Sequence, residues 1–167
     1  MSRLIAALAL MLALAAPVHA AEAGLLSQLV GRTFVIPDAQ AEPVPMEFTA
    51  PEDGVVEVHI AGQTIDRYRF ANGAGEHINV SAPDVVSTAA FGPDQWSRSY
   101  KGLTITYALN GEGDLVARLS GAVEDWQRPS FVYGHNPAHP DLRERLRAAL
   151  EAAHAEADRY EGHDHEH

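Results

Sequence analysis

The residues best suited to chemistry lie at the end of the chain, where three of its nine histidines alternate with acidic residues over Gly162 to His167. Imidazole nitrogens beside carboxylate oxygens suit zinc, nickel or copper(II). Just upstream, Glu151, His154 and Asp158 fall at i, i+3 and i+7 of a predicted helix, so they share one face and can extend the same site. We therefore predict a divalent transition-metal site (Zn²⁺, Ni²⁺ or Cu²⁺), with no organic cofactor, at His163, His165, His167, His154 and Asp158.

The alternative is that these residues only form a solvated end of the chain. A second pair of candidate metal ligands, His135 and His139, flanks Asn136-Pro137-Ala138 in a predicted loop. His139 also lies just before a predicted helix, so it can equally be a residue of the helix start.

No catalytic residues are predicted. The chain has no cysteine, no Gly-x-Ser-x-Gly and no His-Glu-x-x-His. Ser97, Ser99, His77 and Asp94 can be combined into a triad on paper, but any chain of this length allows such a choice. We expect a binding protein rather than an enzyme.

The first 20 residues are typical of a secretory signal peptide. Arg3 is followed by an apolar run from Leu4 to Ala16, and a small-x-small cleavage site ends at Ala20. The run is too short to span a membrane. The expected location of the mature protein is the periplasm or the cell exterior.

The net charge of the chain limits the classes of partner that we expect. The formal net charge is -11, and the predicted leader contains Arg3 but no acidic residue, so the mature chain is more acidic still. Nucleic acid and anionic membrane surfaces are therefore unsuitable partners, whereas metal cations, small molecules or a partner protein are suitable.

The stretch Met46 to Phe70 predicts three antiparallel strands. Apolar residues alternate with polar ones on both sides of the turn at Pro51 to Gly54. Because one face of such strands is apolar, we expect four side chains to point inward: Phe48, Val56, Val58 and Tyr68.

Similar alternation elsewhere predicts about eight strands joined by short connections, and therefore an antiparallel up-and-down meander that closes into a small barrel. Ranges 38–45, 71–75 and 92–100 are expected as loops, and 23–30 as a short helix. Leu142, Leu146 and Leu150 predict a C-terminal amphipathic helix that packs on the barrel. The expected organisation is a signal peptide (1–20), a mainly β barrel domain (21–137), a helix (138–161) and a His- and acid-rich tail (162–167).

This layout resembles the calycin superfamily, the lipocalin-like barrels, over residues 24 to 160. Gly31-Arg32-Thr33-Phe34 occupies the position of the Gly-x-Trp of that family, with Phe34 near the place of the tryptophan. The resemblance implies a barrel that binds a small ligand in its mouth. Aromatic residues that can line such a cavity, or simply fill the core, are Tyr68, Phe70, Tyr107, Trp96 and Trp126.

Two functions thus remain open from the sequence. The first is an exported protein that handles a transition metal through its C-terminal histidines. The second is a barrel that binds a small apolar molecule or a partner protein, for example as an inhibitor that presents the loop Gly92 to Tyr100.

Overall fold

The computed structural model describes residues 23–71, 74–124 and 127–163. The predicted signal peptide, Trp126, His165 and His167 lie outside these residues. The elements are α2 (Gly24–Gln28), β1 (Thr33–Pro37), β2 (Pro43–Thr49), β3 (Val55–Ile60), β4 (Gln63–Ala71), β5 (Ala74–Asn79), β6 (Val86–Phe91), β7 (Gln95–Tyr100), β8 (Leu103–Leu109), β9 (Leu115–Gly121), β10 (Ser130–Gly134) and α3 (Leu142–His163).

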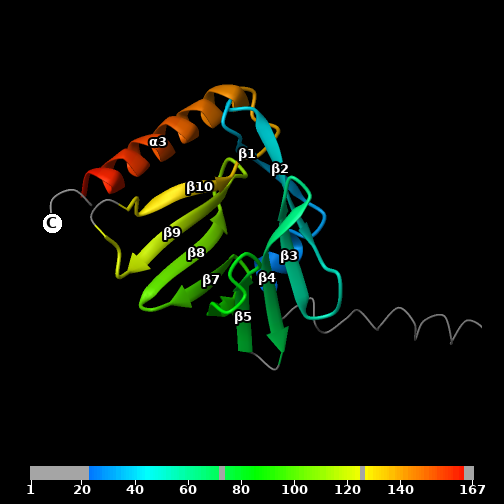
Figure 1. Cartoon of the computed structure of the whole chain (residues 1–167). Coiled ribbons are helices and arrows are strands. Elements are labelled where there is room, and N and C mark those ends of the chain that lie inside the picture. The colour runs from blue at the N-terminus through cyan, green and yellow to red at the C-terminus, as the bar shows by residue number, and fades with distance from the viewer. Residues whose placement is uncertain (1–22, 72–73, 125–126, 164–167) are drawn as a thin grey trace, which may run out of the picture.

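The strands form one antiparallel sheet in which each pairs with its neighbours in the sequence, from β1 through β10. The sheet curls into a nearly closed barrel (Figure 1). Its two edges meet where the Val35 and His135 backbones exchange hydrogen bonds of 2.9 and 2.8 Å. The predicted antiparallel meander with a C-terminal helix is confirmed, but the predicted number of about eight strands was wrong, because the sheet has 10.

The largest error concerns β7, which lies within the range 92–100 predicted as a loop. Trp96, Arg98 and Tyr100 alternate with three polar residues, and the positively charged Arg98 on the inward side conceals the apolar alternation. Two other predicted loops were also too long, because β2 begins at Pro43 and β5 at Ala74.

The predicted three-strand unit from Met46 to Phe70 is confirmed. Phe48 pairs with Val58, and Val56 with Tyr68. All four side chains are buried. They share the core with residues from the other strands, so the period-2 pattern correctly identified the inward face.

A β-bulge in β4 decides which side chains face the interior. Val58 pairs with Asp66 and His59 with Thr64, which leaves Ile65 as the extra residue. The Thr64 hydroxyl lies 3.1 Å from Nδ1 of His59, and the His59 ring lies 3.6 Å from Glu57. Asp66, two residues further along β4, is buried. The bulge thus allows Asp66 to face the core.

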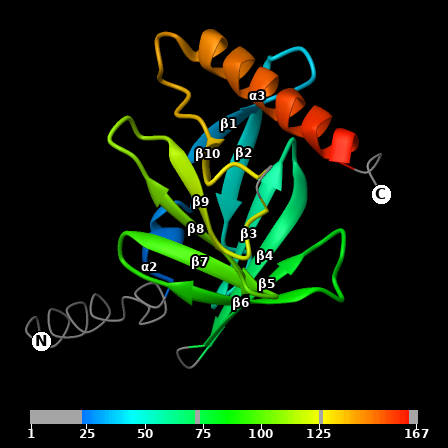
Figure 2. The same ribbon diagram turned by 90° about the vertical axis from the view of Figure 1, so that its left-hand side faces the viewer.

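One end of the barrel is covered by α2, which packs against β6 and β7 (Figure 2). Leu26 and Leu29 are buried in the barrel core. The Leu25 amide donates a 2.8 Å hydrogen bond to the carbonyl of Gly92 in the β6–β7 turn. Gly24 has φ +51 and approaches this turn so closely that a Cβ would lie 2.0 Å from the Gly92 oxygen, so the contact requires glycine.

The C-terminal helix α3 packs on the outside of the barrel (Figure 2), as predicted. Leu146 is fully buried against Val35 and Ala41, and Leu142 and Leu150 are partly buried beside it. No helix within residues 23–71, 74–124 and 127–163 is long and apolar enough to cross a bilayer.

Candidate functional site

The predicted metal ligands are only partly within the described chain. His154 and Asp158 are exposed on α3, which continues to His163, whereas His165 and His167 lie outside the described residues. In the described part of the chain, no three His, Cys, Asp or Glu side chains come together as a metal site. Metal binding by the tail therefore stays a prediction.

The predicted cavity residues within the described chain belong to the packed core. Tyr68, Phe70, Trp96 and Tyr107 are all buried there. The Trp96 and Tyr107 rings stack with centroids 4.7 Å apart, and Tyr68 meets Trp96 edge-on. The expectation that Trp96 lies in or beside a loop was wrong, because it occupies the second position of β7.

Three ionisable side chains meet inside the barrel, between this aromatic core and the end of the barrel opposite α2. Asp66 comes from β4, His77 from β5 and Arg98 from β7, and the first two are buried. Nε2 of His77 lies 2.6 Å from Oδ1 of Asp66. The Tyr133 hydroxyl donates a 3.2 Å hydrogen bond to the other carboxylate oxygen, Oδ2.

The three residues form an interior cluster, Asp66–His77–Arg98, centred on the His77 ring. Besides its contact with Asp66, Nε2 of His77 lies 2.8 Å from Nη1 of Arg98, and Nδ1 lies 3.3 Å from the same nitrogen. Burial raises the pKa of Tyr133, which keeps its hydroxyl a hydrogen-bond donor to Asp66.

Arg98 is only partly satisfied by this cluster. All its polar contacts with Asp66 and His77 use Nη1. Its Nε is buried and has no hydrogen-bond partner among the described residues. Nε belongs to the Nε–Nη2 edge, which is the edge that binds a carboxylate side-on with two hydrogen bonds, so at least one donor of this edge is unused within the described residues.

Arg98 lines a cavity of about 200 Å³ at this end of the barrel. Its other walls are mostly apolar, with a few polar groups. They are formed by His77, Asn79, Val85, Ser87, Tyr100, Leu103 and Ile105. A mainly apolar hollow lined by a charged side chain with an unpartnered donor has the usual composition of a small-molecule site.

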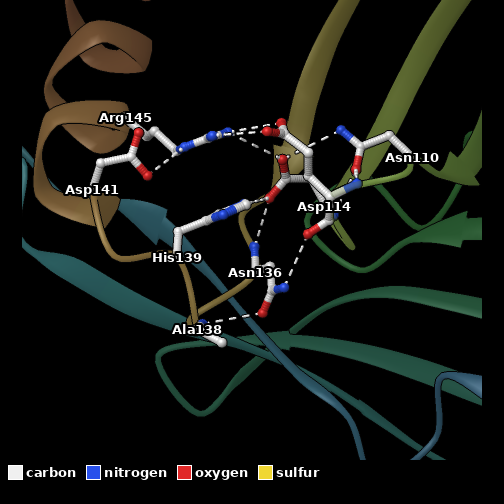
Figure 3. A network of polar contacts seen from close by, with 8 residues as sticks. Asn110, Asp114, Asn136, Ala138, His139, Asp141 and Arg145 are labelled. Atoms are coloured by element: carbon white, nitrogen blue, oxygen red, sulfur yellow. Dashed lines mark hydrogen bonds and ion pairs between the residues drawn. The ribbon is translucent and has the colours of Figure 1, made fainter.

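A second cluster of the same residue types, Asp114–His139–Arg145, joins the barrel to α3 (Figure 3). Oδ1 of the buried Asp114 accepts hydrogen bonds from the backbone amide of Asn136 at 2.8 Å and from Nε2 of His139 at 2.7 Å. Oδ2 accepts from the Asn110 side chain at 3.3 Å and lies 3.7 Å from Nη1 of Arg145. His139 is thus engaged with a carboxylate.

Each guanidinium nitrogen of Arg145 in this second cluster has a carboxylate acceptor. Nε of Arg145 donates to Asp141, and its Nη1 and Nη2 donate to the two carboxylate oxygens of Glu112 (Glu112 is unlabelled in Figure 3). Burial acts to raise the pKa of Asp114, but hydrogen bonds from Asn136 and His139 more than offset it and hold that pKa below its ordinary value. This cluster is a clamp between the β8–β9 turn and α3.

The sequence did not indicate Asp66 or Arg98, and it gave His77 only as part of an arbitrary triad. A usable signal was present for Asp66, because it precedes Tyr68 and Phe70 in the same alternating series. A carboxylate at an inward position of a predicted strand calls for a buried partner.

Comparisons with models of protein families, with curated proteins and with solved structures found no match to the chain. The resemblance to calycins therefore stays an expectation from the sequence.

Proposed function

We propose that the protein is an exported binding protein for a small molecule with a carboxylate group, held at the end of the barrel opposite α2. The observation that carries this proposal is the buried Nε of Arg98, which has no partner among the described residues, in a side chain that lines a cavity. A buried N–H without an acceptor is costly, and a carboxylate on the Nε–Nη2 edge would supply that acceptor.

The cavity also limits the rest of the ligand. Its volume of about 200 Å³ corresponds to about seven water molecules at roughly 30 Å³ each. Val85, Leu103 and Ile105 offer apolar contact to a short hydrocarbon chain or a single ring. We therefore expect butanoate and benzoate to be of the right class.

The interior cluster prepares Arg98 for such a ligand. Asp66 and His77 hold Nη1 from one side, so the guanidinium plane is oriented before the ligand arrives. A pre-oriented group loses less conformational entropy on binding.

Isothermal titration of the purified protein with butanoate and benzoate tests the proposal. Butanamide and benzamide serve as neutral ligands of the same shape. We expect the acids to bind and the amides to bind at least ten-fold more weakly. Equal affinity for acids and amides would contradict the proposed role of the arginine edge.

Two variants assign the binding to a residue. Arg98→Gln should weaken acid binding at least ten-fold, which is about 1.4 kcal/mol. Arg118→Gln, which removes an exposed arginine of β9, should leave it unchanged. Arg98→Lys should not restore full affinity, because lysine keeps the charge but lacks the two-donor edge.

Transition-metal binding by the C-terminal region remains a second proposed function. It is supported by the continuity of α3, which presents Glu151, His154 and Asp158 as exposed residues next to the tail. Titration with zinc, nickel and copper should give binding to the full protein and weaker binding to a chain that ends at Glu161. Binding should also weaken as the pH falls through about 6.5, because protons compete for imidazole. Equal metal binding by both chains would remove the tail from this function.

A further inference from the structure

A second hollow, separate from the Arg98 cavity, lies between α3 and the barrel. Its volume is about 450 Å³, within the range of small-molecule sites. The barrel contributes apolar side chains that include Ile36, Phe131 and Val132. The helix contributes Ala148, Ala149 and Ala153, whose short side chains leave the space unfilled.

His135 lies at this hollow with no partner for its ring. The residue is 5% exposed, and neither Nδ1 nor Nε2 has a hydrogen-bond partner among the described residues. Its backbone is fixed by the two hydrogen bonds with Val35 that join the edges of the barrel. The imidazole is therefore held in place with a donor and an acceptor unused.

The electrostatics of the hollow favour an uncharged ligand. Burial lowers the pKa of His135, so its ring is neutral at pH 7. The two arginines at the hollow are already paired: Arg128 with Glu156 at 2.5 Å, and Arg145 with Glu112 and Asp141. A carboxylate ligand would therefore gain no unpaired cation here.

The geometry points to a binding site for a neutral, mainly apolar molecule that carries a hydroxyl group, with His135 as the polar contact and α3 as one wall. A hydroxyl is the fitting group because it can both donate to and accept from a neutral imidazole. The site differs from the Arg98 cavity in place and in ligand charge, so the two can be tested independently.

The experiment is a titration of the ¹⁵N-labelled protein followed by amide NMR, with 4-propylphenol as the probe. Propylbenzene lacks the hydroxyl and 4-propylbenzoate replaces it with a charge. We expect 4-propylphenol to shift amide signals of residues 35–36, 131–135 and 148–153, with an affinity at least ten-fold above those of the other two at these signals.

Three variants complete the test. His135→Phe keeps an aromatic ring and should reduce the affinity for 4-propylphenol at least ten-fold while leaving propylbenzene unchanged. Ala149→Leu should narrow the hollow and weaken the binding of 4-propylphenol at least ten-fold, and Ala153→Met, at an exposed position, provides a second narrowing variant if the first does not fold.

The proposal is overturned if 4-propylphenol causes no shifts at these residues or binds the His135→Phe variant as tightly as the original protein. It is equally overturned if propylbenzene or 4-propylbenzoate binds here as well as the phenol does.

Discussion

The interior cluster Asp66–His77–Arg98 and the clamp Asp114–His139–Arg145 are made of the same three residue types in different surroundings. In both, a buried aspartate lies within 2.6 to 2.7 Å of a histidine Nε2. They differ at the arginine. All three guanidinium nitrogens of Arg145 have acceptors, whereas Arg98 leaves Nε without one among the described residues.

This difference separates a structural role from a binding role. The clamp links the β8–β9 turn to α3, and every guanidinium nitrogen of its arginine is paired, so it stabilises the contact between these two parts of the fold. The interior cluster holds an arginine that lines a cavity and whose Nε has no partner among the described residues. Residue type alone therefore does not distinguish the two roles, and the count of unused donors does.

The largest expected effect is on the clamp. Asp114→Ala should lower the free energy of unfolding by about 3–5 kcal/mol, because it leaves His139, Arg145 and the Asn136 amide without a buried carboxylate. Urea unfolding measures this change. The control is Asp84→Ala at an exposed loop position, where the change should be close to zero. A similar value for both variants would show that the cluster does not act as a clamp.

The packing of α3 gives the next largest effect. Leu146 is fully buried between α3 and the barrel, so Leu146→Ala should cost about 2–4 kcal/mol in the same unfolding experiment. Leu150→Ala, at a partly buried position of the same face, should cost less. If Leu146→Ala has no cost, α3 is not docked on the barrel in solution.

Period-2 and helical spacing were sufficient for the parts of the fold with a clean apolar face, such as Met46 to Phe70 and Leu142 to Leu150. They failed where a polar residue faces inward. The charge of Arg98 obscured the strand pattern of β7. In β5 the apolar side chain of Ile78 suggested the wrong inward face, whereas its neighbour His77 is the buried residue. The candidate site is built from such exceptions, which three different strands, β4, β5 and β7, bring together, so local patterns could indicate Asp66 as an inward carboxylate but not its partners.

The same substitution at Arg145 and at Arg98 tests whether the two arginines have separate roles. Arg145→Gln should lower the unfolding midpoint without changing benzoate affinity. Arg98→Gln should reduce benzoate affinity at least ten-fold, about 1.4 kcal/mol, while α3 stays docked. Thermal unfolding and calorimetric titration of both variants measure this. Loss of benzoate binding in Arg145→Gln would contradict the assignment of separate roles.

The smallest expected effect is the pH dependence caused by His135. Its folded-state pKa is lowered by burial, so below about pH 6.5 the unfolded chain takes up a proton that the folded protein does not. Stability from the neutral ring is present above that pH and decreases as the pH falls through the folded pKa. The stability of His135→Phe relative to the original protein should therefore rise on acidification from pH 7. A pH-independent difference would mean that the ring is not held neutral.

The most direct test of the central claim is the ¹H–¹⁵N NMR signal of the arginine Nε–Hε groups during addition of benzoate. If Arg98 keeps this donor for a carboxylate, its Hε signal should move downfield and its exchange with water should slow as benzoate is added. Benzamide should produce neither change, and the signal of the exposed Arg118 should stay constant. An Arg98 signal that does not respond to benzoate, or that responds equally to benzamide, would contradict the claim that this arginine binds a carboxylate.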